Sequence, residues 1–342
     1  MPRTNLGCPE SPVATLRYGR RRDRGLTAAL SRLFDEIRNP TTSRGRIIVV
    51  LLAALVFALL SLMVASGLFL SRALMPLKVA ETTSTESFLG TAETVEFQTP
   101  DGRIHSGWFF PGLRGGPVIV LCHGYRSSRA EVMTLATSFQ MHRYNVLTFN
   151  FAGHGDSPVN YTTLGNRESV ELLAALEMLK SRSDVDANKV GLWGYSLGGY
   201  AVLDAAPDFP GVKAVVVDSA YSRPSNLLRR ELNRLGADLI PILSTASILQ
   251  FHVFSFFQPH RPGPRRSLER LGAVPKLFIV SGDAEPLGRY TQELYDAAPA
   301  PKELATLPRT SLPTLNEEER GTYENLVIRF FLQNLPVNAV RR

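Results

Sequence analysis

The sequence predicts an α/β fold built on a mostly parallel sheet. Short, almost continuous apolar runs alternate with amphipathic helical patterns, as expected of parallel strands covered by helices on both faces. A hairpin predicted over Thr94–Thr99 and Arg103–Phe110, around Pro100-Asp101-Gly102, would add an antiparallel edge. The other expected strands are 117–122, 145–150, 189–194, 213–218, 276–281 and 302–307, and the expected helices lie near 128–142, 166–181, 197–206, 287–298 and 316–334.

The positive charge of the chain is concentrated in an N-terminal tail. The 342 residues have a net charge of +7, but residues 1–46 alone hold ten arginines and four acidic residues. The remainder is nearly balanced and shows no basic stretch interleaved with aromatic residues, so we expect no nucleic-acid partner. Cys8 lies in the tail and Cys122 at the end of an apolar run, which makes a disulfide between them implausible.

Residues 47–71 contain no charged side chain and are dominated by Leu, Val, Ala and Ile. A helix of this length spans roughly 35 Å, enough for a hydrocarbon core of about 30 Å. A cleavable signal peptide is the alternative, but its apolar core is shorter and no small-x-small cleavage site follows here. We therefore predict a retained transmembrane helix whose partner is the lipid bilayer.

The arginines flanking this segment predict its orientation. Ten arginines precede it, whereas only Arg72 and Lys78 follow closely. The excess of positive charge on the cytoplasmic side predicts a single-pass protein of the cell membrane with a cytoplasmic tail and its globular domain on the other side. Residues 72–92 are rich in Thr, Ser and Glu and are expected to form a linker to a domain over 93–335.

A long insertion, about 221–272, separates two expected strands of the sheet. Asn226–Leu235 has an amphipathic helical pattern, and Leu239–Phe257 is strongly apolar. A second membrane span is excluded, since it would place two strands of one sheet on opposite sides of the bilayer. The segment is expected to be a cap, which either favours an apolar or acyl small molecule or only packs on the sheet.

One segment combines a buried strand, a reactive residue and a helix. Val190–Trp193 is an apolar run, Gly-x-Ser-x-Gly follows with Ser196 at its centre, and Ala201–Ala206 has a helical pattern. Glycines two residues either side of the serine allow the sharp turn that exposes its hydroxyl. The alternative is a Gly-rich strand-to-helix turn with a purely structural role.

Two further runs end in related motifs, and together the three resemble the α/β-hydrolase superfamily, in particular membrane-anchored serine hydrolases of the esterase and serine-aminopeptidase type. Residues 117–125 end in His123-Gly124-Tyr125, and 145–157 end in Gly-His-Gly-Asp-Ser. The resemblance covers roughly 93–335 and implies Ser196 as nucleophile, with the amides of Leu197 and Tyr125 as oxyanion donors.

The resemblance places the acid of the catalytic triad after a late strand. Here 278–282 leads into Asp283-Ala284-Glu285, and alignment on Gly282 puts Glu285 at the acid position with Asp283 as the near alternative.

The histidine expected next in the triad is missing. The segment 302–313 contains none, and no histidine follows His260. The six histidines are His105, His123, His142, His154, His252 and His260. The resemblance makes His123 and His154 structural, so only His252 or His260, in the cap, remains as a candidate base. Loss of the base costs on the order of 10⁶ in kcat.

Two functions therefore remain open from the sequence. One is a membrane-anchored serine hydrolase for esters or other acyl compounds with an unconventional base. The other is a hydrolase-fold protein without turnover that binds a ligand or a protein partner; an unrelated activity on the same scaffold is a third alternative. No cofactor or metal is expected, since the sequence shows neither a His/Cys ligand cluster nor a phosphate-binding loop.

Overall fold

Strands form where the apolar runs lie, and they join in one sheet. The computed structural model describes residues 31, 35, 42–78 and 92–337. Within them eight strands take the order β1-β2-β4-β3-β5-β6-β7-β8, in which β1 and β2 pair antiparallel, β2 pairs antiparallel with β4, and the others are parallel. The strands are β1 Glu93–Gln98, β2 Ile104–Phe110, β3 Gly116–Cys122, β4 Asn145–Phe149, β5 Val185–Tyr195, β6 Val212–Asp218, β7 Lys276–Ser281 and β8 Lys302–Leu307. The predicted hairpin and parallel strands are confirmed.

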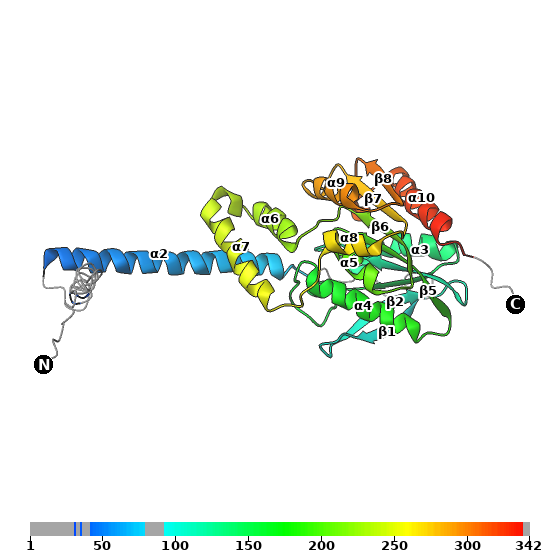
Figure 1. Cartoon of the computed structure of the whole chain (residues 1–342), viewed down its shortest axis with the longest axis horizontal. Coiled ribbons are helices and arrows are strands. Elements are labelled where there is room, and N and C mark those ends of the chain that lie inside the picture. Colours follow the sequence, from blue (N-terminus) through cyan, green and yellow to red (C-terminus); the bar gives the residue numbers. More distant parts are fainter. Residues whose placement is uncertain (1–30, 32–34, 36–41, 79–91, 338–342) are drawn as a thin grey trace, which may run out of the picture. The chain divides into compact units, whose positions relative to one another are not determined.

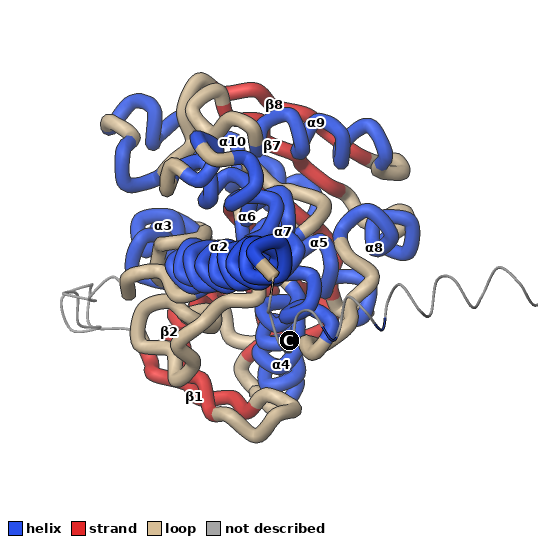
Figure 2. The backbone as a smooth tube through the Cα atoms, turned by 90° about the vertical axis from the view of Figure 1, so that its left-hand side faces the viewer, coloured by secondary structure: helices blue, strands red, loops and turns tan. Residues whose placement is uncertain are grey.

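Helices cover both faces of this sheet, because its central strands are buried on each side. On one face α3 (Met133–Met141) and α10 (Glu317–Asn334) share a core with alternate residues of the strands. The opposite face carries α4 (Asn166–Lys180), α5 (Leu197–Ala205) and α9 (Leu287–Ala297). Figure 2 shows α3 and α8 (Pro264–Leu271) on opposite sides of the strands.

The expected apolar helix is present as α2 (Ser43–Leu74), longer at both ends than the predicted 47–71. Within the described residues it is the one helix long and apolar enough to cross a membrane. The chain divides into two compact units inside this helix, residues 1–63 and 64–342. The linker residues 79–91 and most of the basic tail lie outside the described residues.

The insertion between β6 and β7 is helical. Its first helix, α6 (Pro224–Arg234), and its apolar helix, α7 (Pro241–Phe256), agree with the two predicted segments. A third helix, α8 (Pro264–Leu271), was not predicted; it packs against α5 and α9. In the second unit, the last turns of α2 contact α7 and the loop that precedes α4: Ser247 Oγ donates to the Ser66 carbonyl at 3.0 Å, and the Thr162 amide donates to the Leu74 carbonyl at 2.8 Å.

Candidate active site

Ser196 lies at the junction of β5 and α5 in a backbone conformation that non-glycine residues rarely adopt. Its φ is 50° and its ψ −104°. Such a conformation persists only where neighbouring contacts hold it, and it is a recurring feature of functional sites. Here the Ser196 amide donates to the Asp218 carbonyl at 2.8 Å, and its carbonyl accepts from the Tyr200 amide at 3.0 Å. The sharp turn expected from Gly-x-Ser-x-Gly is therefore formed.

Close backbone packing fixes this turn against the loop after β3. A Cβ on Gly198 would lie 2.1 Å from the carbonyl oxygen of Cys122, so α5 begins directly against the end of β3. A Cβ on Gly124 would lie 2.6 Å from the ring of Tyr195. The two segments that carry the predicted oxyanion donors are thus in contact with each other.

The predicted donors have free N–H groups. Neither the Leu197 nor the Tyr125 amide donates a hydrogen bond to any described residue, and Leu197 is the first residue of α5, where the helix dipole favours negative charge. The side chain of Tyr125 points elsewhere, since its hydroxyl donates to the Ala73 carbonyl at 2.7 Å. Two amides that have no acceptor in the described structure are suited to donate hydrogen bonds to an oxyanion.

His123 holds the loop that carries Tyr125. Its Nε2 accepts from the Phe151 amide at 3.0 Å, so the proton lies on Nδ1, which donates to the Gly124 carbonyl at 2.8 Å. Burial lowers the pKa of His123 to about 3, with the neighbouring His154 adding to the effect, so the ring is neutral. Both nitrogens are occupied, which agrees with the structural role that the resemblance implies.

No imidazole is hydrogen-bonded to Ser196 in the described part of the chain. His154 is buried and donates from Nδ1 to the Ala152 carbonyl at 2.8 Å. His252 and His260, the two candidates left open by the sequence, are exposed, and their ring neighbours are phenylalanines of α7. A conventional base for Ser196 is therefore absent from the described residues.

The two predicted acids lie after β7, both exposed. Glu285 makes no hydrogen bond with a described residue, whereas Asp283 accepts from the Ser281 hydroxyl. The charge of Asp283 also helps to raise the pKa of Asp218 and of Tyr195, although burial is the larger cause for both. Asp283, the alternative in the sequence alignment, is thus exposed but near enough for its charge to act on Asp218 and Tyr195.

A buried carboxyl group that the sequence reasoning did not single out lies beside Ser196. Asp218 ends β6 next to Tyr195 and accepts hydrogen bonds from Ser219 Oγ at 2.8 Å, Thr310 Oγ1 at 3.0 Å and Tyr323 Oη at 2.9 Å. Burial raises its pKa to about 7, although the three donors partly oppose this. In the sequence, the feature that could have pointed to Asp218 is its position directly after the apolar run Val215–Val217.

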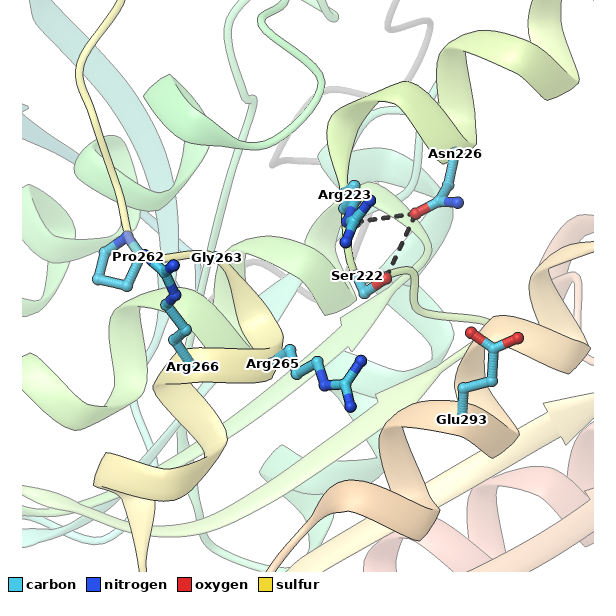
Figure 3. A pocket seen from close by; sticks show the side chains of 8 residues that line it. All are labelled: Ser222, Arg223, Asn226, Pro262, Gly263, Arg265, Arg266 and Glu293. Carbon is cyan, nitrogen blue, oxygen red and sulfur yellow. Dashed lines mark hydrogen bonds between the residues drawn. The ribbon is translucent and has the colours of Figure 1, made fainter.

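Two cavities lie near the carboxyl ends of the strands. The smaller, about 20 Å³, is beside the turn at Ser196 and is lined by Gly124, Tyr195 and Ser311 among others. The larger, about 400 Å³, lies where α6, α8 and α9 meet, and three arginines line it: Arg223, Arg265 and Arg266 (Figure 3). The two cavities share no lining residue, so this basic cavity is separate from the surroundings of Ser196.

These features define the class of protein: a mostly parallel sheet with a strained serine between strand and helix is the α/β-hydrolase fold. The chain belongs to the alpha/beta hydrolase family, whose model matches residues 119–327.

The chain is also similar to known proteins in sequence and in structure. The uncharacterised protein YfhR of Escherichia coli is 23% identical over 255 residues, 72% of this chain and 82% of that protein. An uncharacterised protein of Mycobacterium tuberculosis is 28% identical over 230 residues, 66% of this chain and 74% of that one. The Pyrococcus furiosus esterase Pf2001 superposes with a TM-score of 0.62 at 21% identity, covering 77% of this chain and 98% of the esterase.

Proposed function

We propose that this protein is a membrane-anchored hydrolase of esters or related acyl compounds, in which Ser196 is the nucleophile and turnover is slow because no imidazole serves as its base. The observation that carries the proposal is the strained backbone of Ser196, φ 50°, next to two amides that donate to no acceptor in the described part of the chain. If the turn had only a structural role, glycine at position 196 would adopt the same backbone conformation without strain, so the strained serine favours a functional role.

The chemistry that this arrangement supports is acyl transfer. Ser196 Oγ forms a bond to the ester carbonyl carbon, and the oxyanion accepts from the Leu197 and Tyr125 amides. The carbon–alkoxide bond then breaks, and the hydroxyl proton passes through water to the leaving alkoxide. A second water hydrolyses the acyl-serine. Without a positioned base the first step is slow, and oxyanion stabilisation accounts for the rate that remains.

The test is labelling with a fluorophosphonate probe on the full chain in membranes. We expect slow labelling, mapped to Ser196 by peptide mass spectrometry and abolished in Ser196→Ala. Rapid labelling would reveal a base, and the variants His252→Ala and His260→Ala would then locate it. Absence of any Ser196-dependent adduct after prolonged exposure would remove the nucleophile from the proposal.

A second candidate is a binding protein that keeps the fold without turnover. It is favoured by Thr310, which lies in the loop after β8 where the resemblance places the triad histidine, and whose hydroxyl is committed to Asp218. Such a protein would bind an ester or its analogue reversibly, in a manner that survives Ser196→Ala. Equilibrium dialysis of wild type and variant with a non-hydrolysable acyl analogue distinguishes the two candidates.

Anchoring through α2 is part of the proposal. Support comes from its 32 residues, its apolar composition and the ten arginines that precede the apolar run. In sealed cells, a protease added outside should digest the hydrolase domain while a reporter fused before residue 1 stays intact. The reverse pattern would show that the hydrolase domain lies on the cytoplasmic side.

A further inference from the structure

The cap helix α7 packs against α2 through one of its faces. Ser247 Oγ donates to the Ser66 carbonyl at 3.0 Å, and Gln250 Nε2 donates to Ser66 Oγ at 2.7 Å. Leu243, Ser247 and Phe251 are buried on the same side. Ser66 belongs to the uncharged run 47–71, so this face of α7 lies along the last turns of the segment proposed to cross the membrane (Figure 1).

The opposite face of α7 is mostly apolar and is not covered by any described residue, with Thr245 and His252 exposed at its edge. Ile242, Leu249, Val253 and Phe256 follow one another at intervals of seven, four and three residues, which places them on one stripe of a helix. They are 62%, 65%, 59% and 70% exposed. The 16 residues of α7 contain no charged side chain. A surface helix of a water-soluble domain carries polar residues on its outer face, so this stripe is suited to an apolar surrounding.

The apolar stripe continues into the residues at each end of α7. Leu239 and Ile240 precede the helix and are 84% and 54% exposed, and Phe257 follows it at 76%. On the adjoining turn of α2, Leu68 is 62% exposed. The exposed apolar residues of α7 and Leu68 thus belong to two helices that contact each other through Ser66.

The charge of the cap complements a phospholipid surface. Residues 221–272 contain eight arginines and three acidic residues. Four of the arginines are exposed and have no ion-pair partner among the described residues: Arg223, Arg229, Arg265 and Arg266. The arginines lie outside α7, in the segments on either side of it, where basic residues beside an inserted apolar face can attract anionic headgroups.

We infer that α7 inserts its exposed face into the leaflet in which α2 ends, so that the cap is a second membrane contact of this protein. The inference rests on the proposed anchoring by α2. It excludes a second crossing, because α7 is too short to span and β7 follows it in the same sheet. The helix lies in the plane of the interface and holds the domain at the bilayer surface.

The test measures lipid contact at single positions of the full chain in vesicles of phosphatidylcholine and phosphatidylglycerol. Cys8→Ser removes the tail thiol, and Cys122 is fully buried. An environment-sensitive fluorophore is attached at Val253→Cys, with Leu249→Cys as a second reporter on the same face. Met141→Cys is the matched control, an apolar position at the end of another helix that is 71% exposed. Val56→Cys, in α2, reports on the anchor itself.

We expect a spin-labelled lipid to quench the label at 253 and at 249 several-fold more than the label at 141. Quenching at 56 with none at 253 or 249 would overturn the inference and leave the anchor standing. No quenching at 56 would overturn the anchoring instead. A third outcome would also contradict the inference. In it, the label at 253 is shielded from aqueous iodide but is not quenched by the spin-labelled lipid, and the shielding grows as the protein-to-lipid ratio rises. This result would identify a second copy of the chain as the occupant of the exposed face.

Discussion

The Thr310 hydroxyl donates a hydrogen bond of 3.0 Å to Oδ1 of Asp218, whose own carbonyl accepts from the Ser196 amide at 2.8 Å. The loop after β8, where the resemblance expects the base, is thus joined to the nucleophile turn through a buried carboxyl group. Thr310 and Asp218 are both fully buried. Where the resemblance expects a histidine, the structure therefore has a threonine bonded to Asp218.

The Asp218 carboxyl group should make stability depend on pH. Its pKa is raised from 3.8 to about 7, chiefly by burial, so the folded protein holds this proton more tightly than the unfolded chain. The contribution of this carboxyl group to the free energy of unfolding consequently falls as pH rises from about 4 to about 7 and is level above that, by about 4 kcal/mol at most, whereas the lowered pKa of the buried His123 acts in the opposite direction. Asp218→Asn should remove this slope.

The measurement is the urea midpoint in detergent, followed by fluorescence of Trp108 and Trp193, both buried. Asp238→Asn, at an exposed position of the cap, is the control and should leave the pH profile of the wild type unchanged. An Asp218→Asn protein with the wild-type slope would show that other groups produce it.

Tyr323 should contribute to stability through its hydroxyl. The hydroxyl donates to Asp218 Oδ2 at 2.9 Å and accepts from Trp193 Nε1 at 3.1 Å. Tyr323→Phe leaves the buried indole N–H without an acceptor, for an expected loss of about 1–3 kcal/mol in the free energy of unfolding. Tyr290→Phe, whose hydroxyl bonds to no described residue, should change it by less than about 0.5 kcal/mol. Equal losses in the two variants would refute the assigned role.

Gly198 should tolerate no side chain. The Cβ of Gly198→Ala would lie 2.1 Å from the Cys122 carbonyl oxygen, a backbone atom at the end of β3 that cannot move away separately from the strand. We expect a loss of about 3 kcal/mol or more, together with loss of Ser196 labelling. Gly321→Ala in α10 has nothing within 4 Å and should gain about 0.5–1 kcal/mol from helix propensity. Wild-type stability in Gly198→Ala would mean that the turn is looser than described.

The sequence was sufficient for the sheet but not for the contacts around Asp218. The central strands are apolar throughout, and Gly-x-Ser-x-Gly between an apolar run and an Ala-rich segment predicts the turn at Ser196, because these patterns are local. Thr310 and Tyr323 lie 92 and 105 residues from Asp218. Their meeting depends on the order of strands β5, β6, β7 and β8, which the sequence pattern leaves open.

In the cap, too, the sequence predicted the elements but not the contacts between them. The apolar character of Leu239–Phe257 was evident, but a helix without charged residues, whose few polar side chains lie on more than one side, does not reveal which side is covered. The contact between Ser247 and Ser66 decides this, since it turns Leu249 and Val253 outward. The short helix α8 was missed because its eight residues hold only two apolar side chains besides Pro264, namely Leu268 and Leu271, too few to stand out within the long insertion.

An imidazole placed beside Ser196 should restore part of the missing catalysis. Ser311 is the position of choice, because it is half-buried and lines the small cavity next to Gly124 and Tyr195, whereas Thr310 is committed to Asp218. A positioned general base contributes typically about 10²–10⁴ in rate. In Ser311→His, with no carboxylate tuned to orient the ring, we expect fluorophosphonate labelling of Ser196 to accelerate about tenfold or more.

The rate of labelling in Ser311→His should also rise with pH through about 6.5, since only the neutral imidazole accepts a proton. Ser311→Phe provides a ring without a base and should show neither the acceleration nor the pH profile. The double variant Ser196→Ala/Ser311→His should not be labelled at all, which ties the effect to the serine. If Ser311→His keeps the urea midpoint of the wild type and still labels at the wild-type rate, the loop after β8 does not face the nucleophile. In that case the absence of a histidine there would not explain slow turnover, and the binding function would become the better account of the fold.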